Sequence, residues 1–518
     1  MVGGANMRRI FAGAGFAVLL TVLASCAQLP SLEGRSVTTA FDDTQGTRLG
    51  RAIQPMANNH PGKSGVVPLT RGGDAFAARA LMTQAAQRSI DIQNYIWHDD
   101  MAGILLFNAL VEAADKGVRV RLLLDDNNTD GLDGVLAALD SHDNIEVRLF
   151  NPFLYRNWRW VGYLTDFSRL NRRMHNKSFT VDNQATIVGG RNIGDEYFGA
   201  SDEFLFIDLD ALAVGPVVKD VSSDFDRYWA SASAYPVGLI LERADDDGLA
   251  RLHDNAQQVA RDPKAAGYVK AMNELPIVTQ LLDGSIELEW AVTRMVSDDP
   301  SKGLGTADTN EMLPERLGRI FGVPQRDLFL VSPYFVPAQD GTEYLSALAR
   351  SGVEITVLTN SLEATDVAAV HAGYVKRRKP LLQAGVQLYE IKQQSSVAPF
   401  HDRGLTGSSA SSLHAKTLSV DGERIFIGSF NFDPRSARLN TENGFVIDSP
   451  GLAQRLPAAI QEQAVDIAYQ VRLTDSGQLR WHERRDGKTI VHTAEPGAGL
   501  LLQMGVWILS HLPIEWLL

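Results

Sequence analysis

The chain has 518 residues, of which 45% are hydrophobic and 21% charged, proportions typical of a soluble globular protein rather than a disordered or polytopic membrane chain. Its 49 basic and 62 acidic side chains give a formal net charge of -13, which disfavours a general nucleic-acid binder. The single cysteine excludes internal disulfides and any cysteine-based zinc or iron–sulfur site.

Residues 1–25 have the features of a secretory signal peptide. Arg8 and Arg9 precede an apolar stretch, residues 10–22, that is short for a spanning helix. The following Leu-Ala-Ser-Cys is similar to the bacterial lipobox and contains the only cysteine, Cys26. The pattern predicts cleavage before Cys26 and lipidation of its thiol, which would anchor the protein on the periplasmic face of the inner or outer membrane. A signal-anchor helix is the alternative.

From about residue 75, helical and strand patterns alternate, which favours an α/β sandwich. In the first half we expect helices at 76–87 and 104–114 and strands at 90–96, 118–124 and 145–150. In the second half we expect strands at 328–331, 353–358 and 386–391 and a helix at 344–349. The same order of elements recurs after about 240 residues. This period is too long for a solenoid and indicates a duplicated domain whose halves face each other.

The pattern divides the chain into six expected segments. They are the signal peptide 1–25, lipidated Cys26 with a tether to residue 65, a first domain 66–241, a helical connector 242–284, a second domain 285–450, and a C-terminal extension 451–518. The end of the extension, residues 499–518, is apolar but interrupted by polar residues, so it suits either a membrane interface or a cap on the core.

One motif of chemistry-bearing residues occurs in each half. The first copy comprises His175, Lys177, Asp182 and Asn192, and the second comprises His414, Lys416, Asp421 and Asn431, each 239 positions later. On a strand, residues two apart point to the same face, so each histidine should project beside its lysine. We count all eight as candidate catalytic residues, although the odd step to each aspartate predicts a structural role for it.

This pair of motifs resembles the mark of the phospholipase D superfamily, H-x-K-x4-D-x6-G-[GS]-x-N in two copies, and the resemblance covers residues 75–450. It implies a pseudo-twofold α/β sandwich with two central mixed sheets and an active site between the halves. It also implies His175 as the nucleophile that forms a phosphohistidine and His414 as the general acid. The lysines and asparagines would neutralise the phosphate oxygens, so no metal or other cofactor is implied.

Two further carboxylates resemble the family's histidine-orienting groups. Asp208 lies on a strand that leads to Gly-Pro, and Glu442 follows the second motif. Either could instead be a solvated charge at a strand end. A metal site at Asp125 and Asp126 is disfavoured because the second half has no acidic counterpart there.

Three features favour a lipid phosphodiester as substrate. They are the membrane anchor, the acidic charge, and the stretch Tyr155–Arg173, which mixes five arginines with Trp158, Trp160 and Tyr163. Such a stretch suits an interface that holds anionic head groups, or else its aromatics pack on the domain.

Residues 174–198 and 365–390 resemble bacterial cardiolipin synthases of the C type. This resemblance implies transfer of a phosphatidyl group from phosphatidylethanolamine or phosphatidylglycerol to phosphatidylglycerol. The alternatives are a phospholipase D-type hydrolase, an extracytoplasmic nuclease, and a non-catalytic lipid-binding scaffold of the envelope.

Overall fold

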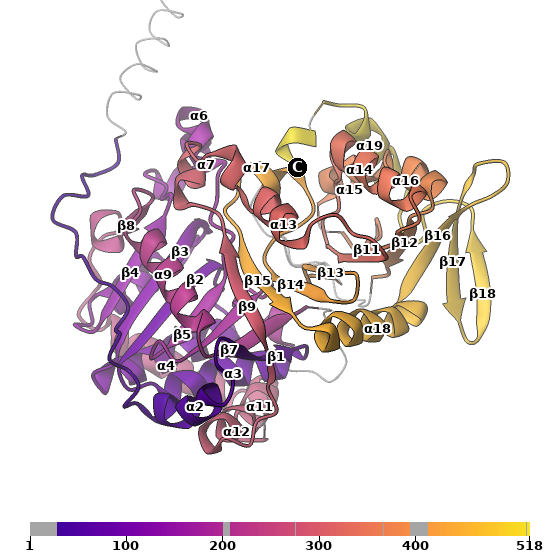
Figure 1. Ribbon diagram of the computed structural model, residues 1–518. Coiled ribbons are helices and arrows are strands. Elements are labelled where there is room, and N and C mark those ends of the chain that lie inside the picture. Colours follow the sequence, from indigo (N-terminus) through magenta and orange to yellow (C-terminus); the bar gives the residue numbers. More distant parts are fainter. Residues whose placement is uncertain (1–27, 200–207, 275, 366, 394–412, 514) are drawn as a thin grey trace, which may run out of the picture.

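The computed structural model describes residues 28–199, 208–274, 276–365, 367–393, 413–513 and 515–518. It contains two mixed β-sheets, one in each half of the chain, with helices on their faces (Figure 1). Cys26, for which lipidation is predicted, lies outside the described residues.

The two sheets repeat the same order of six strands. In the first sheet the order is β4 (Ile145–Phe150), β3 (Arg119–Asn128), β2 (Ser89–Ile96), β5 (Ser178–Val181), β6 (Ala185–Gly189) and β7 (Asp210–Val214). In the second it is β12 (Gln387–Ile391), β11 (Glu354–Asn360), β10 (Asp327–Val331), β13 (Thr417–Val420), β14 (Arg424–Gly428) and β15 (Asn443–Asp448). In each set the first three strands are parallel and the rest antiparallel, which confirms the predicted duplication.

One strand connects the two sheets. Residues 289–291 of β9 (Glu289–Ser297) pair with β1 (Ser64–Leu69) of the first sheet. Residues 292–297 of the same strand pair with β15 of the second sheet. The halves are therefore joined by backbone hydrogen bonds, and β6 of the first sheet contacts β14 and β15 of the second.

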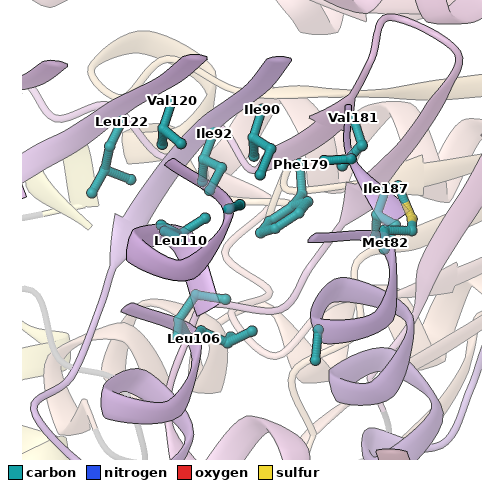
Figure 2. Close-up of a cluster of buried hydrophobic side chains, with 14 of the residues drawn as sticks. Met82, Ile90, Ile92, Leu106, Leu110, Val120, Leu122, Phe179, Val181 and Ile187 are labelled. Carbon is teal, nitrogen blue, oxygen red and sulfur yellow. The ribbon is translucent and has the colours of Figure 1, made fainter. Parts of the chain in front are cut away.

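The core of the first half lies between its sheet and the helices α3 (Gly72–Ala85) and α4 (Met101–Asp115) (Figure 2). Alternate residues of β2, Ile90 and Ile92, point to these helices, as the period of two dictates. Leu106 and Leu110, four apart on α4, meet them from the helix side. Truncating such a residue to alanine costs about 2–5 kcal/mol.

The predicted tether is wrong for residues 28–65. Residues 48–58 form helix α2 (Arg48–Asn58), capped by Thr47, and Leu49 and Ile53 are buried in the core of the first half. Ahead of the helix, Arg35 donates a hydrogen bond to the carbonyl of Ser231 at 2.6 Å. Polar composition hid this helix because only four of its side chains, those of Leu49, Ile53, Met56 and Ala57, pack on the core.

The predicted connector is helical, but its helices α10 (Gly248–Arg261), α11 (Ala266–Glu274) and α12 (Ile277–Asp283) pack on α4, α3 and α2 of the first half. The C-terminal extension does not begin a separate unit. After α18 (Pro450–Ile467), β16 (Ala468–Leu473) pairs with β12, and β17 (Leu479–Arg485) and β18 (Lys488–His492) extend the second sheet. No helix in the described ranges is long and apolar enough to cross a bilayer.

Candidate active site

The first motif lies against a segment of the second half. The backbone N–H of His175 donates to the carbonyl of Thr441 at 2.9 Å, and that of Lys177 donates to Oδ1 of Asn443 at 3.1 Å. These contacts place His175 and Lys177, just ahead of β5, beside the start of β15. The site is therefore built across the boundary of the two halves, as predicted.

Each histidine is held by a carboxylate of the opposite half. Nδ1 of His175 lies 2.8 Å from Oε2 of Glu442, and Nδ1 of His414 lies 2.9 Å from Oδ2 of Asp208. Both carboxylates are buried, so the orienting role predicted for Asp208 and Glu442 fits their positions better than that of solvated charges. Because Nδ1 of each ring is engaged, Nε2 is the nitrogen left to react with a substrate.

The residues beside these carboxylates explain the Gly-Gly and Gly-Ser variants of the motif. A Cβ on Gly190 would lie 2.4 Å from Oδ1 of Asp208, so a larger side chain would displace that carboxylate. In the second half the equivalent residue is Ser429, whose hydroxyl donates to Oε2 of Glu442 at 2.5 Å. In the first half the position must be glycine because the Asp208 carboxylate occupies the space of a side chain. In the second half a serine side chain fits there and donates a hydrogen bond to Glu442.

The two lysines are buried next to their histidines. Nζ of Lys177 donates to the carbonyl of His175 at 2.7 Å, and Nζ of Lys416 donates to that of His414 at 2.5 Å. Burial lowers the pKa of Lys177 to about 7 against the opposing pull of Glu442. A bound phosphodiester would bring further negative charge beside both ammonium groups.

The charges of the site favour neutral histidines when no substrate is bound. Burial and the nearby lysines lower the pKa of His175 well below its usual value and that of His414 to about 4. Neutral His175 has the lone pair that a nucleophile requires. An anionic phosphate would offset the lysines and raise both pKa values, which would help His414 to carry the proton that a general acid donates.

The two carboxylates differ in their electrostatic surroundings. Burial raises the pKa of Glu442 to about 7, although Lys177 and the hydroxyl of Ser429 oppose this. Burial also acts on Asp208, but His414 outweighs it and holds the pKa of Asp208 well below its usual range. Only the pair formed by His414 and Asp208 therefore has a firmly ionised carboxylate, which stabilises an imidazolium at His414 and suits the acid role.

The asparagines of the motif are buried in the same region. Oδ1 of Asn192 accepts the N–H of Ile96 at 3.3 Å, whereas its Nδ2 has no partner among the described residues. A buried donor without a partner is costly unless a ligand satisfies it, so this amide is suited to a phosphate oxygen. Asn431, ten residues after Asp421, is buried at the equivalent position.

The two motif aspartates have a structural role, which corrects their inclusion among the catalytic residues. Both lie at the far ends of their strands with positive φ, 53° for Asp182 and 55° for Asp421. The carboxylate of Asp182 accepts the backbone N–H groups of residues 87–89, and that of Asp421 accepts those of residues 325–327. Each fixes the loop that enters the central strand of its half.

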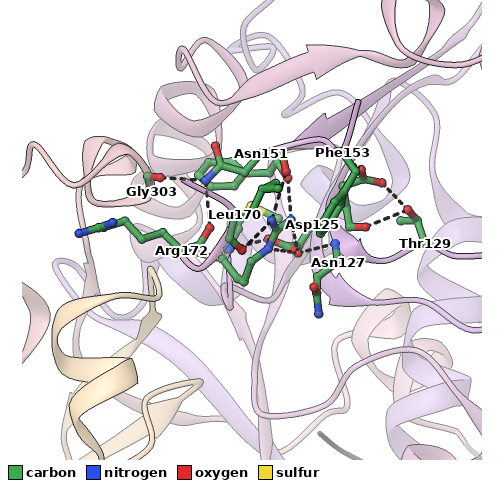
Figure 3. A network of polar contacts seen from close by, with 12 residues as sticks. Asp125, Asn127, Thr129, Asn151, Phe153, Leu170, Arg172 and Gly303 are labelled. Carbon is green, nitrogen blue, oxygen red and sulfur yellow. Dashed lines mark hydrogen bonds and ion pairs between the residues drawn. The ribbon is translucent and has the colours of Figure 1, made fainter. Parts of the chain in front are cut away.

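Both acids that could have suggested a metal site are bonded within the protein, and Figure 3 shows this for Asp125. Asp125 accepts from Nε of Arg173 at 2.8 Å and from the backbone N–H of Met174 at 2.7 Å, just ahead of His175. Asp126 is ion-paired with Arg156. Arg156 and Arg173 are therefore occupied within the protein, and the prediction that this stretch holds head groups through its arginines is wrong for these two.

Sequence reasoning missed several side chains that complete the site. Tyr95 packs edge-on against His175 with ring centroids 4.9 Å apart, and Tyr197 packs against His414 at 5.1 Å. Behind Glu442, Asp298 accepts its backbone N–H at 3.0 Å and forms an ion pair with Lys302 at 2.9 Å. A tyrosine also stands 239 positions after Tyr95, at Tyr334, and this is the spacing of the two motif copies, so the repeat could have indicated Tyr95. Nothing in the sequence indicates the pair of Asp298 and Lys302.

Two halves of matching topology that each supply a histidine, a lysine and an asparagine to one buried site define a phospholipase D-like protein. The family model "Cardiolipin synthase, PLD-like domain" matches residues 80–229 and 321–463, so the chain belongs to this family.

The chain is also similar to individual proteins of known sequence or structure. The chain is 52% identical to cardiolipin synthase C of Escherichia coli (strain K12) over 91% of this chain and 100% of that protein. It is 27% identical to a cardiolipin synthase of Geobacillus thermodenitrificans (strain NG80-2), over 73% of this chain and 62% of that protein. The crystal structure of phosphatidylserine synthase from Haemophilus influenzae Rd KW20 shares the fold, with a TM-score of 0.54 at 13% identity and coverage of 91% and 100%.

Proposed function

We propose that this protein is a phosphatidyltransferase that forms cardiolipin by moving a phosphatidyl group onto phosphatidylglycerol. The observation that carries the proposal is the crosswise pairing of His175 with Glu442 and of His414 with Asp208 around two buried lysines. The family and the 52% identity to a protein named cardiolipin synthase C support a lipid substrate. The donor is phosphatidylethanolamine or phosphatidylglycerol.

The first step is attack on the donor. Nε2 of His175 forms a bond to phosphorus, and the bond from phosphorus to the head-group oxygen breaks. His414 gives its Nε2 proton to that oxygen, so ethanolamine or glycerol leaves with an uncharged hydroxyl group rather than as an alkoxide. Lys177, Lys416 and the asparagines stabilise the charge that develops on the phosphate oxygens.

The second step reverses these roles. A hydroxyl of phosphatidylglycerol attacks the phosphohistidine, its proton passes to His414, and the bond from phosphorus to Nε2 of His175 breaks. Water in place of the lipid alcohol would give phosphatidic acid, so the alternative hydrolase differs only in the acceptor.

The test is to incubate the purified full chain with phosphatidylglycerol and phosphatidylethanolamine vesicles and to analyse the lipids by mass spectrometry. Cardiolipin together with glycerol or ethanolamine, absent with His175→Ala and His414→Ala, is the expected result. Phosphatidic acid alone would show a hydrolase. No turnover by a folded protein would favour the non-catalytic scaffold, and salt-sensitive cleavage of single-stranded DNA would favour the nuclease.

We also propose that Cys26 carries a lipid anchor on the periplasmic side of the membrane. Its support is the Leu-Ala-Ser-Cys sequence behind an apolar signal. Metabolic labelling with a fatty acid should mark the wild-type chain and not Cys26→Ala, and labelling of both would contradict the assignment.

A further inference from the structure

Large hydrophobic side chains are exposed in two segments that lie far apart in the sequence. Of the twenty such side chains in the described ranges, twelve belong to these segments. The first segment contributes Trp158, Trp160, Leu164 and Phe167, and the second contributes Leu500, Leu501, Leu502, Met504, Trp507, Ile508, Leu512 and Trp516. All four of the exposed tryptophans in the described chain are among them. A concentration of this kind marks an interaction surface.

The second segment is exposed although its composition is that of a buried helix. Helix α19 (Leu500–Ser510) is apolar around most of its circumference, which is normally found in a protein core or in lipid. It packs on α15 (Ala368–Val375), yet only Val506 of the helix is fully buried. Leu501 remains 85% exposed and Trp507 65% exposed.

The two segments are joined at one residue. Nη2 of Arg435 donates to Oδ1 of Asn171, at the end of α7 (Phe167–Leu170), at 2.7 Å. Nε of the same guanidinium donates to the carbonyl of Leu517 at 3.1 Å, beside Trp516. Arg377 fixes the second segment from the other side through an ion pair with Glu515 at 2.8 Å. These hydrogen bonds and the ion pair therefore hold both segments in fixed positions on the domain.

This junction adjoins the active site. Asn171 lies four residues before His175 in the chain, and Arg435 lies seven residues before Glu442, which holds that histidine. Arg435 also interacts electrostatically with Tyr95, whose ring packs against His175. The junction of the two exposed apolar segments therefore lies close to the first histidine motif.

The position of the N-terminal end indicates what covers this surface. In Figure 1, α6 (Arg159–Thr165), α7, α19 and the C-terminus lie along the upper edge of the molecule. The indigo segment with which the described chain begins lies near the same edge, and in the sequence it starts two residues after the cysteine for which we propose a lipid anchor. An anchor at this edge would bring both segments to the bilayer.

We propose that the surface formed by residues 158–167 and 500–516 inserts its side chains into the outer part of a phospholipid bilayer and holds the active site against it. Tryptophan is suited to the level of the head groups, and leucine, isoleucine and methionine to the acyl chains just below. The apolar side chains make this contact, because Arg156 and Arg173 are bound to Asp126 and Asp125. The proposal names the membrane contact of the site and rests on the proposed lipid substrate.

The first test measures insertion without turnover. The full chain is reconstituted into vesicles of phosphatidylethanolamine and phosphatidylglycerol that contain dibrominated acyl chains, which quench nearby tryptophans. Quenching should be strong for the wild type and largely lost in the fourfold variant Trp158→Phe, Trp160→Phe, Trp507→Phe and Trp516→Phe. The control Trp290→Phe should leave the quenching unchanged. Equal quenching of the wild type and the fourfold variant, or none in the wild type, would overturn the proposal.

The second test separates membrane contact from chemistry. Leu501→Glu combined with Ile508→Glu should lower kcat/KM on vesicles by about tenfold or more while kcat on monomeric short-chain phosphatidylglycerol stays the same. Val491→Glu, at an exposed apolar residue of β18, is the matched control and should change neither.

Equal losses on vesicles and on monomeric lipid would overturn the proposal, because the segment would then act on the chemistry. Failure of the proposed function would appear differently, as quenching that depends on the four tryptophans without any turnover. If the wild type is a dimer that Leu501→Glu converts to a monomer and the tryptophans are not quenched by lipid, a second copy covers the surface and the proposal is wrong.

Discussion

The substitution Gly190→Ala tests whether the carboxylate of Asp208 must be held in place for His414 to act. The new Cβ would lie 2.4 Å from Oδ1 of Asp208, whereas ordinary contacts begin at 3.4 Å, so the carboxylate must move by about 1 Å. Such a shift lengthens the 2.9 Å contact between Oδ2 and Nδ1 of His414 beyond hydrogen-bond distance. The side chain of Asp208 is buried and has little room for a different rotamer.

A misplacement of about 1 Å in a catalytic group costs roughly 100-fold in rate, or about 2.7 kcal/mol of activation free energy. We therefore expect kcat for phosphatidyl transfer to fall about 100-fold in Gly190→Ala. The matched change is Ser429→Ala, because the Cβ is already accommodated there and only a hydroxyl that donates to Glu442 is lost. The change removes this hydrogen bond and the one that the hydroxyl accepts from the backbone N–H of Asn443, at about 1 kcal/mol each, but leaves the carboxylate where it is. It should therefore lower kcat by less than about 30-fold.

The assay is the initial rate of cardiolipin formation at saturating phosphatidylglycerol, with thermal unfolding of each variant measured in parallel. A wild-type rate in a folded Gly190→Ala protein would refute the crosswise role of Asp208. Equal losses in Gly190→Ala and Ser429→Ala would refute the argument from the close approach of the Cβ.

Three further changes test the supports of the site. Asp182→Ala removes the acceptor of three backbone N–H groups and should lower the free energy of unfolding by about 3 kcal/mol, measured in urea; an unchanged value would contradict its structural role. Lys302→Met leaves Asp298 buried without its counter-charge and should cost about 3–5 kcal/mol, partly restored by adding Asp298→Asn, and no recovery would contradict the pairing. Folding raises the pKa of Glu442 from 4.5 to about 7, so the folded state binds this proton more tightly than the unfolded state. The resulting contribution to the free energy of unfolding is fully present below pH 4.5 and is lost as the pH rises through 7. Glu442→Gln should therefore flatten the fall in unfolding free energy between pH 5 and pH 8, and an identical slope would contradict this.

The sequence alone identified the residues that carry the chemistry because their signals are local. His175 and Lys177 share one face of an extended segment whatever the rest of the chain does, and the spacing of 239 residues repeats this feature at His414. Asp182 is an odd number of residues from Lys177, so the period of two also predicted that its side chain does not share that face. Strand β4 has the predicted bounds, 145–150, because a short run of alternating and branched apolar residues has few other conformations available in a sheet.

Composition was a weaker guide than spacing. The composition of residues 48–58 is that of a polar tether, yet Leu49, Ile53, Met56 and Ala57 pack on the core and hold a helix there. The stretch around Arg156 read as a basic surface, yet its position beside Asp126 turns that arginine inward. Whether a charged or apolar side chain is covered depends on what packs over it, which composition does not encode.

The sequence by itself determined that two histidine motifs exist, that they are equivalent, and that Asp208 and Glu442 are the acids to consider. Only the tertiary structure decided which acid holds which histidine. Glu442 is 267 residues from His175 and Asp208 is 206 residues from His414, so each pair forms only when β9 brings the two sheets together. Strand periodicity acts over a few residues, whereas the pairing of groups across an interface depends on how the two halves pack.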